Sequence, residues 1–220
     1  MSERLIAVGD IHGCKTALDR LLDSIQPAAN DTIVTLGDYI DRGPDSRGVI
    51  DRLIQLRSET HYIALMGNHE EMMLNVVQHD YPHESWLRFG GVDTLDSYDF
   101  GGNLDFLPEE HLEFFQSLQD FFEHDRHFFA HAAYAPKIPL DEQSADMLRW
   151  HSLDDVVPSP HLSGKVAVVG HTANTNGEIL DLGHLICIDT YCYGGGWLTA
   201  LDLLSGRKWQ ASKEGIIRNP

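Results

Sequence analysis

The sequence has few basic residues, few cysteines and no long apolar runs. Sixteen Lys and Arg stand against 34 Asp and Glu, which gives a formal net charge of −18. A surface of this charge repels the phosphate backbone of nucleic acids, so we expect no DNA or RNA partner. Any site that handles phosphate in this field needs local positive charge from metal ions or from a placed arginine.

The three cysteines, Cys14, Cys187 and Cys192, make an odd number and lack zinc-type spacing. This pattern favours a reducing compartment over a disulfide framework, and we expect a cytoplasmic protein. The apolar stretch near the N-terminus, residues 5–8, is too short for a signal peptide or a membrane span, and no other window reaches spanning length. We therefore expect no membrane partner.

The composition, with 42% hydrophobic and 23% charged residues, is typical of a globular protein. A chain of 220 residues is long enough for one substantial core, and we predict a single domain over residues 1–220.

Three apolar segments in the first third of the chain each run into a glycine and then a polar residue. Segments 5–8, 32–36 and 62–66 end at Asp10, Asp38 and Asn68. Between them, apolar residues recur at helical spacing over 18–25 and 49–56. The alternation predicts βαβ units and a partly parallel sheet, whose ligand-binding edge lies beyond the carboxyl ends of the strands.

Residues 80–125 are less regular, and we predict a helical insertion there, with helices over 86–92 and 108–119. An insertion on a rigid scaffold is a typical source of substrate specificity. Strands return at 127–130, 166–169, 185–188 and 197–203 without long helices between them, which predicts hairpins. The expected fold is α/β, a two-sheet β-sandwich flanked by helices.

The polar residues at these strand ends are all oxygen or nitrogen ligands. They are Asp10, His12, Asp38, Asn68, His131 and His171. Each alone is more often a turn, a cap or an ordinary histidine, but their joint appearance after apolar strands predicts a metal site. Carboxylate, imidazole and amide donors without thiolate suit Mn, Fe or Zn. If Asp38 bridges, two ions would lie about 3.5–4 Å apart.

The sequence resembles the PPP family of metallophosphatases, within the calcineurin-like phosphoesterase superfamily. The resemblance lies in Gly9-Asp10-Ile11-His12-Gly13, in the run from Gly37 to Gly43 that contains Asp38, Asp41 and Arg42, and in Gly67-Asn68-His69-Glu70. It continues through His131 and His171 to residues 188–201, and it is nearest to the bacterial serine/threonine protein phosphatases.

The resemblance implies a role for each matching residue. Asp10 and His12 would bind the first metal, Asp38 would bridge, and Asn68, His131 and His171 would bind the second. The two divalent ions would be manganese, with iron or zinc as alternatives. Arg42 and Asn68 would hold phosphate, and His69, oriented by Asp41, would protonate the leaving oxygen while a metal-bound hydroxide attacks phosphorus.

The resemblance implies a phosphomonoesterase acting on phosphoserine or phosphothreonine in proteins or peptides, with phosphotyrosine left open. The alternative is a bis(5'-nucleosyl)-tetraphosphatase or another small-molecule phosphatase, a branch in which asparagine more often replaces Asp41. A third reading is a silent scaffold that only binds phosphate.

The family often places a second phosphate-binding arginine after a tryptophan, whereas Arg149 here precedes Trp150. Arg149 is our candidate for that role and His151 a weaker substitute. Tyr191 and Tyr193, in a glycine-rich loop, are either cleft residues or packed loop aromatics.

Overall fold

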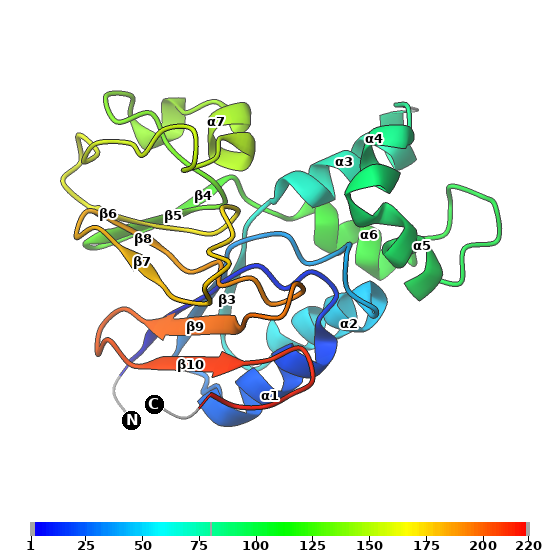
Figure 1. Cartoon of the computed structure of the whole chain (residues 1–220), viewed down its shortest axis with the longest axis horizontal. Coiled ribbons are helices and arrows are strands. Elements are labelled where there is room, and N and C mark those ends of the chain that lie inside the picture. Colours follow the sequence, from blue (N-terminus) through cyan, green and yellow to red (C-terminus); the bar gives the residue numbers. More distant parts are fainter. Residues whose placement is uncertain (1–2, 80, 219–220) are drawn as a thin grey trace.

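Two five-stranded β-sheets pack against each other at the centre of the molecule (Figure 1). The computed structural model describes residues 3–79 and 81–218. The sheets have the strand orders β10-β9-β1-β2-β3 and β4-β5-β6-β8-β7. The strands are β1 (Leu5–Val8), β2 (Thr32–Thr35), β3 (His61–Ala64), β4 (Phe121–His124), β5 (His127–Ala130), β6 (Val166–Val169), β7 (Leu180–Asp181), β8 (Leu185–Cys187), β9 (Leu198–Asp202) and β10 (Lys208–Ala211).

Helices cover both outer faces of the sandwich. Helices α1 and α2 pack on the first sheet, α7 lies over the second, and α3 to α6 gather beside the sheets (Figure 1). The helices are α1 (Lys15–Ile25), α2 (Ser46–Leu56), α3 (Asn68–His79), α4 (Glu84–Trp86), η1 (Leu87–Gly91), α5 (Val92–Ser97), α6 (Glu109–Gln116), η2 (Leu140–Glu142) and α7 (Ala145–Trp150). Within the described residues, no helix is long and apolar enough to cross a membrane.

Strand β1 is apolar at every position because both of its faces are buried. In β1, Leu5 and Ala7 point into the space between the sheets, where they meet Phe129 of β5. Ile6 and Val8 point the other way, towards the apolar faces of α1 and α2. Successive strand residues alternate between faces, so a strand that is buried on both faces is apolar at adjacent positions rather than at alternate ones.

The predicted sandwich is confirmed, and so are the strand–helix alternation over residues 5–79 and the helical character of most of the segment from 84 to 116. Residue 80, where we placed the start of the insertion, lies outside the described residues, and 121–124 form β4 rather than helix. The single-domain assignment over 1–220 stays a prediction.

The predicted hairpins among the late strands are wrong. Strands β5, β6 and β8 pair in parallel, and β9 joins the other sheet, antiparallel to β1. The hairpins that form are β4–β5, β7–β8 and β9–β10, each of which uses a short strand absent from our prediction. Irregular chain and the short α7 provide the crossovers for which we had required long helices.

An ion pair between the half-buried Arg4 and the buried Asp31 links the start of β1 to the loop before β2. Asp31, 1% exposed, pairs with Arg4 and accepts a hydrogen bond from the backbone N–H of Ala28 (2.7 Å). Burial raises the pKa of Asp31, but Arg4 and this N–H lower it further, so its pKa lies below the ordinary value. The pair therefore stabilises the fold above the unfolded-state pKa of about 3.9 and loses this effect as pH falls through the lower folded-state pKa.

Arg4→Met is expected to lower the free energy of unfolding at pH 7 by about 2 kcal/mol, because it leaves a buried carboxylate without its partner. Urea titration of both proteins at pH 7 and near pH 3 measures the effect. The difference between them should shrink at the acid pH, and an equal difference at both would contradict the ion-pair explanation.

Candidate active site

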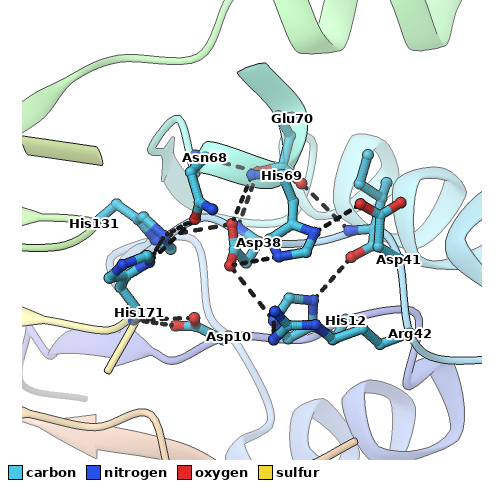
Figure 2. Close-up of polar contacts among 12 residues, drawn as sticks. Asp10, His12, Asp38, Asp41, Arg42, Asn68, His69, Glu70, His131 and His171 are labelled. Atoms are coloured by element: carbon cyan, nitrogen blue, oxygen red, sulfur yellow. Dashed lines mark hydrogen bonds and ion pairs between the residues drawn. The ribbon is translucent and has the colours of Figure 1, made fainter. Parts of the chain in front are cut away.

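The strand ends of both sheets meet at one place. Asp10 and His12 follow β1, Asp38 follows β2, and Asn68 and His69 begin α3 after β3. His131 and His171 follow β5 and β6 of the second sheet. Figure 2 shows Asp38 in the middle, with Asn68, His131 and His171 to one side and His12 and His69 to the other.

Two groups of potential metal ligands share Asp38. The first contains His12, Asp38 and His69, the second Asp38, His131 and His171, and within each group the ligand atoms lie within 4.8 Å of one another. Asn68 joins the second group, since its Oδ1 lies 3.1 Å from both His131 Nε2 and His171 Nδ1. One carboxylate common to two ligand groups is the arrangement that a pair of bridged ions requires.

Hydrogen bonds at the far ring nitrogens fix the tautomer of three of the histidines. His12 Nδ1–H donates to the carbonyl of Ile40 (2.9 Å) and His131 Nδ1–H to that of Leu36 (2.8 Å). His171 Nε2–H donates to the carbonyl of Trp150 (3.2 Å). A carbonyl can only accept, so in each ring the other nitrogen carries a lone pair that faces the cluster, as in metal-binding histidines.

The electrostatics of these three rings agree with this tautomer. Burial lowers the pKa of His12 and His131, and burial together with the neighbouring His131 lowers the pKa of His171 to about 4. All three are therefore neutral at pH 7, which is the form that coordinates a metal.

The donor atoms form a cluster that needs a cation. His131 Nε2 and His171 Nδ1 lie 3.2 Å apart, and His131 Nε2 lies 3.3 Å from Asp38 Oδ1. Two imidazole lone pairs and a carboxylate oxygen face one another here without a proton donor between them, so the residues fit a divalent ion. With no thiolate in either group, the donor set suits Mn, Fe or Zn.

Asp10 lies at the edge of the cluster and touches both sheets. Its carboxylate accepts from the backbone N–H of His171 at 3.0 Å, and it is 3% exposed. Burial, with the nearby charges of Asp189 and Asp38, raises the pKa of Asp10 well above its ordinary value. Asp10 thus keeps its predicted place beside the ligand groups, and Asp189, which the sequence reasoning left without a role, lies next to it.

His69 differs from the other histidines because its partner is a carboxylate. His69 Nδ1 lies 2.6 Å from Asp41 Oδ2, and both side chains are at most 1% exposed. Burial lowers the pKa of His69, but Asp38 and Asp41 outweigh it, so the pKa lies above its ordinary value. A histidine whose protonated form is favoured beside a metal-ligand cluster can donate a proton to a departing oxygen.

Arg42 provides the local positive charge that a phosphate-binding site needs in this acidic protein. Its Nη1 lies 3.1 Å from His12 Nε2, and its guanidinium carbon lies 4.6 Å from the ring centre of Tyr193. The Tyr193 ring also contacts His12 edge-on, with 4.9 Å between ring centres, and Tyr191 contacts Tyr193 at the same distance. Tyr193 is therefore a residue of the site, and Tyr191 packs against it and donates its backbone N–H to Asp189 (3.0 Å).

Glu70 organises the loop that carries Asp38, a role that the sequence reasoning missed. Its buried carboxylate accepts from the backbone N–H groups of Asp38 (2.9 Å), Tyr39 (2.8 Å) and Gly67 (3.1 Å). Burial raises the pKa of Glu70 to about 8, and these donors oppose the rise. Its place directly after Asn68-His69 in the third motif was the available signal.

Several site residues have left-handed backbone. The φ angles are 45° at His12, 50° at Asp38, 70° at Asp41, 69° at Arg42 and 63° at His171. Residues other than glycine rarely adopt this conformation, and such strain concentrates at functional sites. The backbone at the site is also closely packed: a Cβ on Gly170 would lie 2.1 Å from Asp10 Oδ1, so only glycine lets His171 approach Asp10.

Arg149 and His151 are held by carboxylates of their own. Arg149 pairs with Glu71 (3.0 Å) and with Asp120, and the exposed His151 pairs with Asp146 (3.0 Å). The structure brings neither side chain into the ligand groups, and phosphate binding by Arg149 stays a prediction. Trp150 instead supports the site through its backbone carbonyl, the acceptor for His171.

Comparison with known proteins agrees with the geometry. The sequence pattern of the calcineurin-like phosphoesterase family matches residues 3–203. A symmetrical bis(5'-nucleosyl)-tetraphosphatase of Paracidovorax citrulli is 42% identical over 71 residues, which are 32% of this chain and 25% of that protein. Serine/threonine-protein phosphatase 1 of Salmonella typhimurium is 41% identical over 85 residues, 38% of this chain and 37% of that protein.

Solved structures extend the likeness to the whole fold. A protein provisionally named a diadenosine tetraphosphatase superposes with a TM-score of 0.71 at 24% identity, covering 94% of this chain and 92% of that one. A cold-active protein tyrosine phosphatase gives 0.69 at 17% identity, covering 98% and 78%. The match over residues 3–203 spans every strand of the two sheets except β10, and every residue of the two ligand groups. The chain therefore belongs to the calcineurin-like phosphoesterase family.

Proposed function

We propose that this protein is a metal-dependent phosphomonoesterase that releases phosphate from phosphoserine and phosphothreonine in proteins. The observation that carries the proposal is the buried His69–Asp41 pair (2.6 Å) beside the two ligand groups. An alkoxide is a poor leaving group that needs a proton in the transition state, whereas a phenolate or a nucleotide leaves more easily without one. A dedicated proton donor therefore favours serine and threonine esters.

Each side chain of the site has a distinct part in this reaction. Asp10, His12, Asp38, Asn68, His131 and His171 would hold two divalent ions. Such ions polarise phosphoryl oxygens and acidify a coordinated water. Arg42 neutralises charge on the phosphoryl group, and His69 donates its proton to the leaving oxygen while Asp41 keeps the ring in place.

Hydrolysis of dinucleoside polyphosphates is the second candidate. It is favoured by the names of two proteins similar to this chain, the tetraphosphatase of Paracidovorax citrulli and the structure that covers 94% of this chain. The leaving group is then a nucleotide, which can depart without a proton from His69.

A substrate panel separates the candidates. The purified protein, treated with chelator and reloaded with Mn, Zn, Fe or Mg, is assayed against phosphoserine, phosphothreonine and phosphotyrosine peptides and against diadenosine tetraphosphate. We expect the highest kcat/KM with the serine and threonine peptides and with Mn. Preference for diadenosine tetraphosphate would transfer the assignment to the second candidate. Phosphate binding without turnover of any ester would identify a silent scaffold.

The contact of Tyr193 with Arg42 gives a prediction about substrate binding. Tyr193→Leu removes the ring against which the guanidinium packs at 4.6 Å. Loss of a cation–π contact of about 1 kcal/mol is expected to raise KM for a phosphopeptide about fivefold and to leave kcat within about twofold. Tyr193→Phe keeps the ring and is the matched control. A rise in KM in both variants would attribute the effect to the hydroxyl group instead.

A further inference from the structure

Two side chains from the helical segment beside the sheets bind the carboxylate that orients His69. Thr94 of α5 donates from Oγ1 to Asp41 Oδ1 (2.6 Å), and Trp86 of α4 donates from Nε1 to both oxygens of Asp41 (3.1 and 3.0 Å). All three side chains are buried, at no more than 2% exposed. With the bond to His69, donors from three elements surround one carboxylate, which leaves it little freedom to rotate.

The same segment also holds the backbone on which Asp41 lies. Thr94 Oγ1 accepts from the N–H of Asp41 (2.9 Å), and the carbonyl of Gly90 accepts from the N–H of Arg42 (3.4 Å). Both residues have positive φ, so these bonds support a turn that is not favourable by itself. Residues 86–94 thus fix the direction of two site side chains, one on each side of the same peptide bond.

The segment is itself anchored to α2. Ser97 accepts from the backbone N–H of Arg47 (2.9 Å), and the buried His111 bridges Tyr98 (2.8 Å) and Asp51 (2.9 Å). Under Trp86 lies Gly91, where a Cβ would come within 2.6 Å of the indole ring. Gly91 therefore packs against the indole ring of Trp86 while the indole N–H binds Asp41. These contacts hold Trp86, and with it the carboxylate of Asp41, in one position.

We propose that Trp86 and Thr94 are positioning residues for protonation of the leaving group. They aim one oxygen of Asp41 at His69 Nδ1 and so direct His69 Nε2 towards the ligand groups. The inference rests on the proposed function of His69. On this inference the helical segment helps to position the proton donor, in addition to lying beside the site.

The test compares a poor and a good leaving group. Trp86→Phe and Thr94→Val each remove one donor and keep most of the packing volume. We expect each to lower kcat for a phosphoserine peptide about 10- to 100-fold, because a misdirected proton donor loses most of its effect. Turnover of p-nitrophenyl phosphate, whose leaving group needs no proton, should fall less than about threefold. Thr94→Ser retains the hydroxyl and should recover most of the peptide activity.

Two matched variants control for the loss of a buried donor or ring elsewhere. Thr60→Val removes a buried hydroxyl that bonds the carbonyl of Asp31, before β3 and away from the cluster. Trp209→Phe changes a buried indole in β10. Both should retain activity on both substrates, and a thermal melt of every variant confirms folding.

The outcomes separate the inference from the proposed function. If Trp86→Phe and Thr94→Val lower both activities equally while His69→Asn is selective for the peptide, the two residues act only through folding and the inference is wrong. If His69→Asn itself shows no selectivity for the leaving group, the proposed role of His69 fails first. In the His69→Asn background, a second change at Thr94 should cost no further activity.

Discussion

His69→Asn is expected to lower kcat for a phosphoserine peptide by about 10²- to 10⁴-fold, the usual contribution of a general acid. The buried imidazole next to Asp41 is the candidate donor, and asparagine keeps a side chain of similar size without a transferable proton. With p-nitrophenyl phosphate the loss should be less than about tenfold, because the nitrophenolate leaves unprotonated. Steady-state kinetics with both substrates at saturating Mn measures the ratio.

Metal content provides the control for this variant. His69 lies in the first ligand group, so Mn bound per chain is measured for wild type and His69→Asn by elemental analysis. We expect equal content, since the bond to Asp41 marks His69 as a proton donor. Loss of Mn together with an equal loss of both activities would instead identify His69 as a ligand and remove the leaving-group argument.

Asp38→Asn is expected to prevent binding of the ion pair, because Asp38 is the carboxylate that the two ligand groups share. The amide has one oxygen and no charge, and it cannot bridge two cations. We expect no more than one weakly held Mn by calorimetry and a loss of kcat/KM of at least about 10³-fold, for peptide and aryl substrates alike. The equal loss distinguishes this variant from His69→Asn.

Asp202→Asn is the matched control for the change at Asp38. Asp202 is also buried and accepts hydrogen bonds from Leu204 N–H and Ser205. It lies opposite Ile6 in the β1–β9 strand pair, at the end of the strands away from the ligand groups. It should retain both ions and full activity. If Asp38→Asn bound two Mn with unchanged affinity, the shared-carboxylate arrangement would be refuted.

The strands that could be predicted are those whose local pattern reflects burial on both faces. β1 and β2 are apolar or β-branched throughout because each lies between two packed layers. β4 and β10 carry charged residues at edge positions, and β7 has only two residues, so nothing in their sequence distinguishes them from loops. Strand partners depend on contacts far apart in the chain, which explains why the parallel pairing of β5, β6 and β8 was missed.

The residues of the candidate site likewise include some that could be predicted from the sequence and some that could not. Residues such as Asp10 and Asn68 could be predicted because metal chemistry restricts which side chains can follow a strand, and this restriction is visible in the sequence. Trp86 and Thr94 could not, since their importance comes from Asp41, which lies 45 and 53 positions away in the chain. In a segment without regular periodicity, a buried tryptophan is indistinguishable from an ordinary core residue.

The contact between Asp10 and His171 also determines when the protein can acquire activity during synthesis. These two residues are 161 positions apart, and the second ligand group is complete only when the last of them has been made. At the usual pace of translation, about 10–30 s separate the first residue from the second. Through that interval a nascent chain holds Asp10 but lacks His171, so its second ligand group stays incomplete. The second ligand group can therefore form only after strands β1 to β3, which carry the first ligands, have been made.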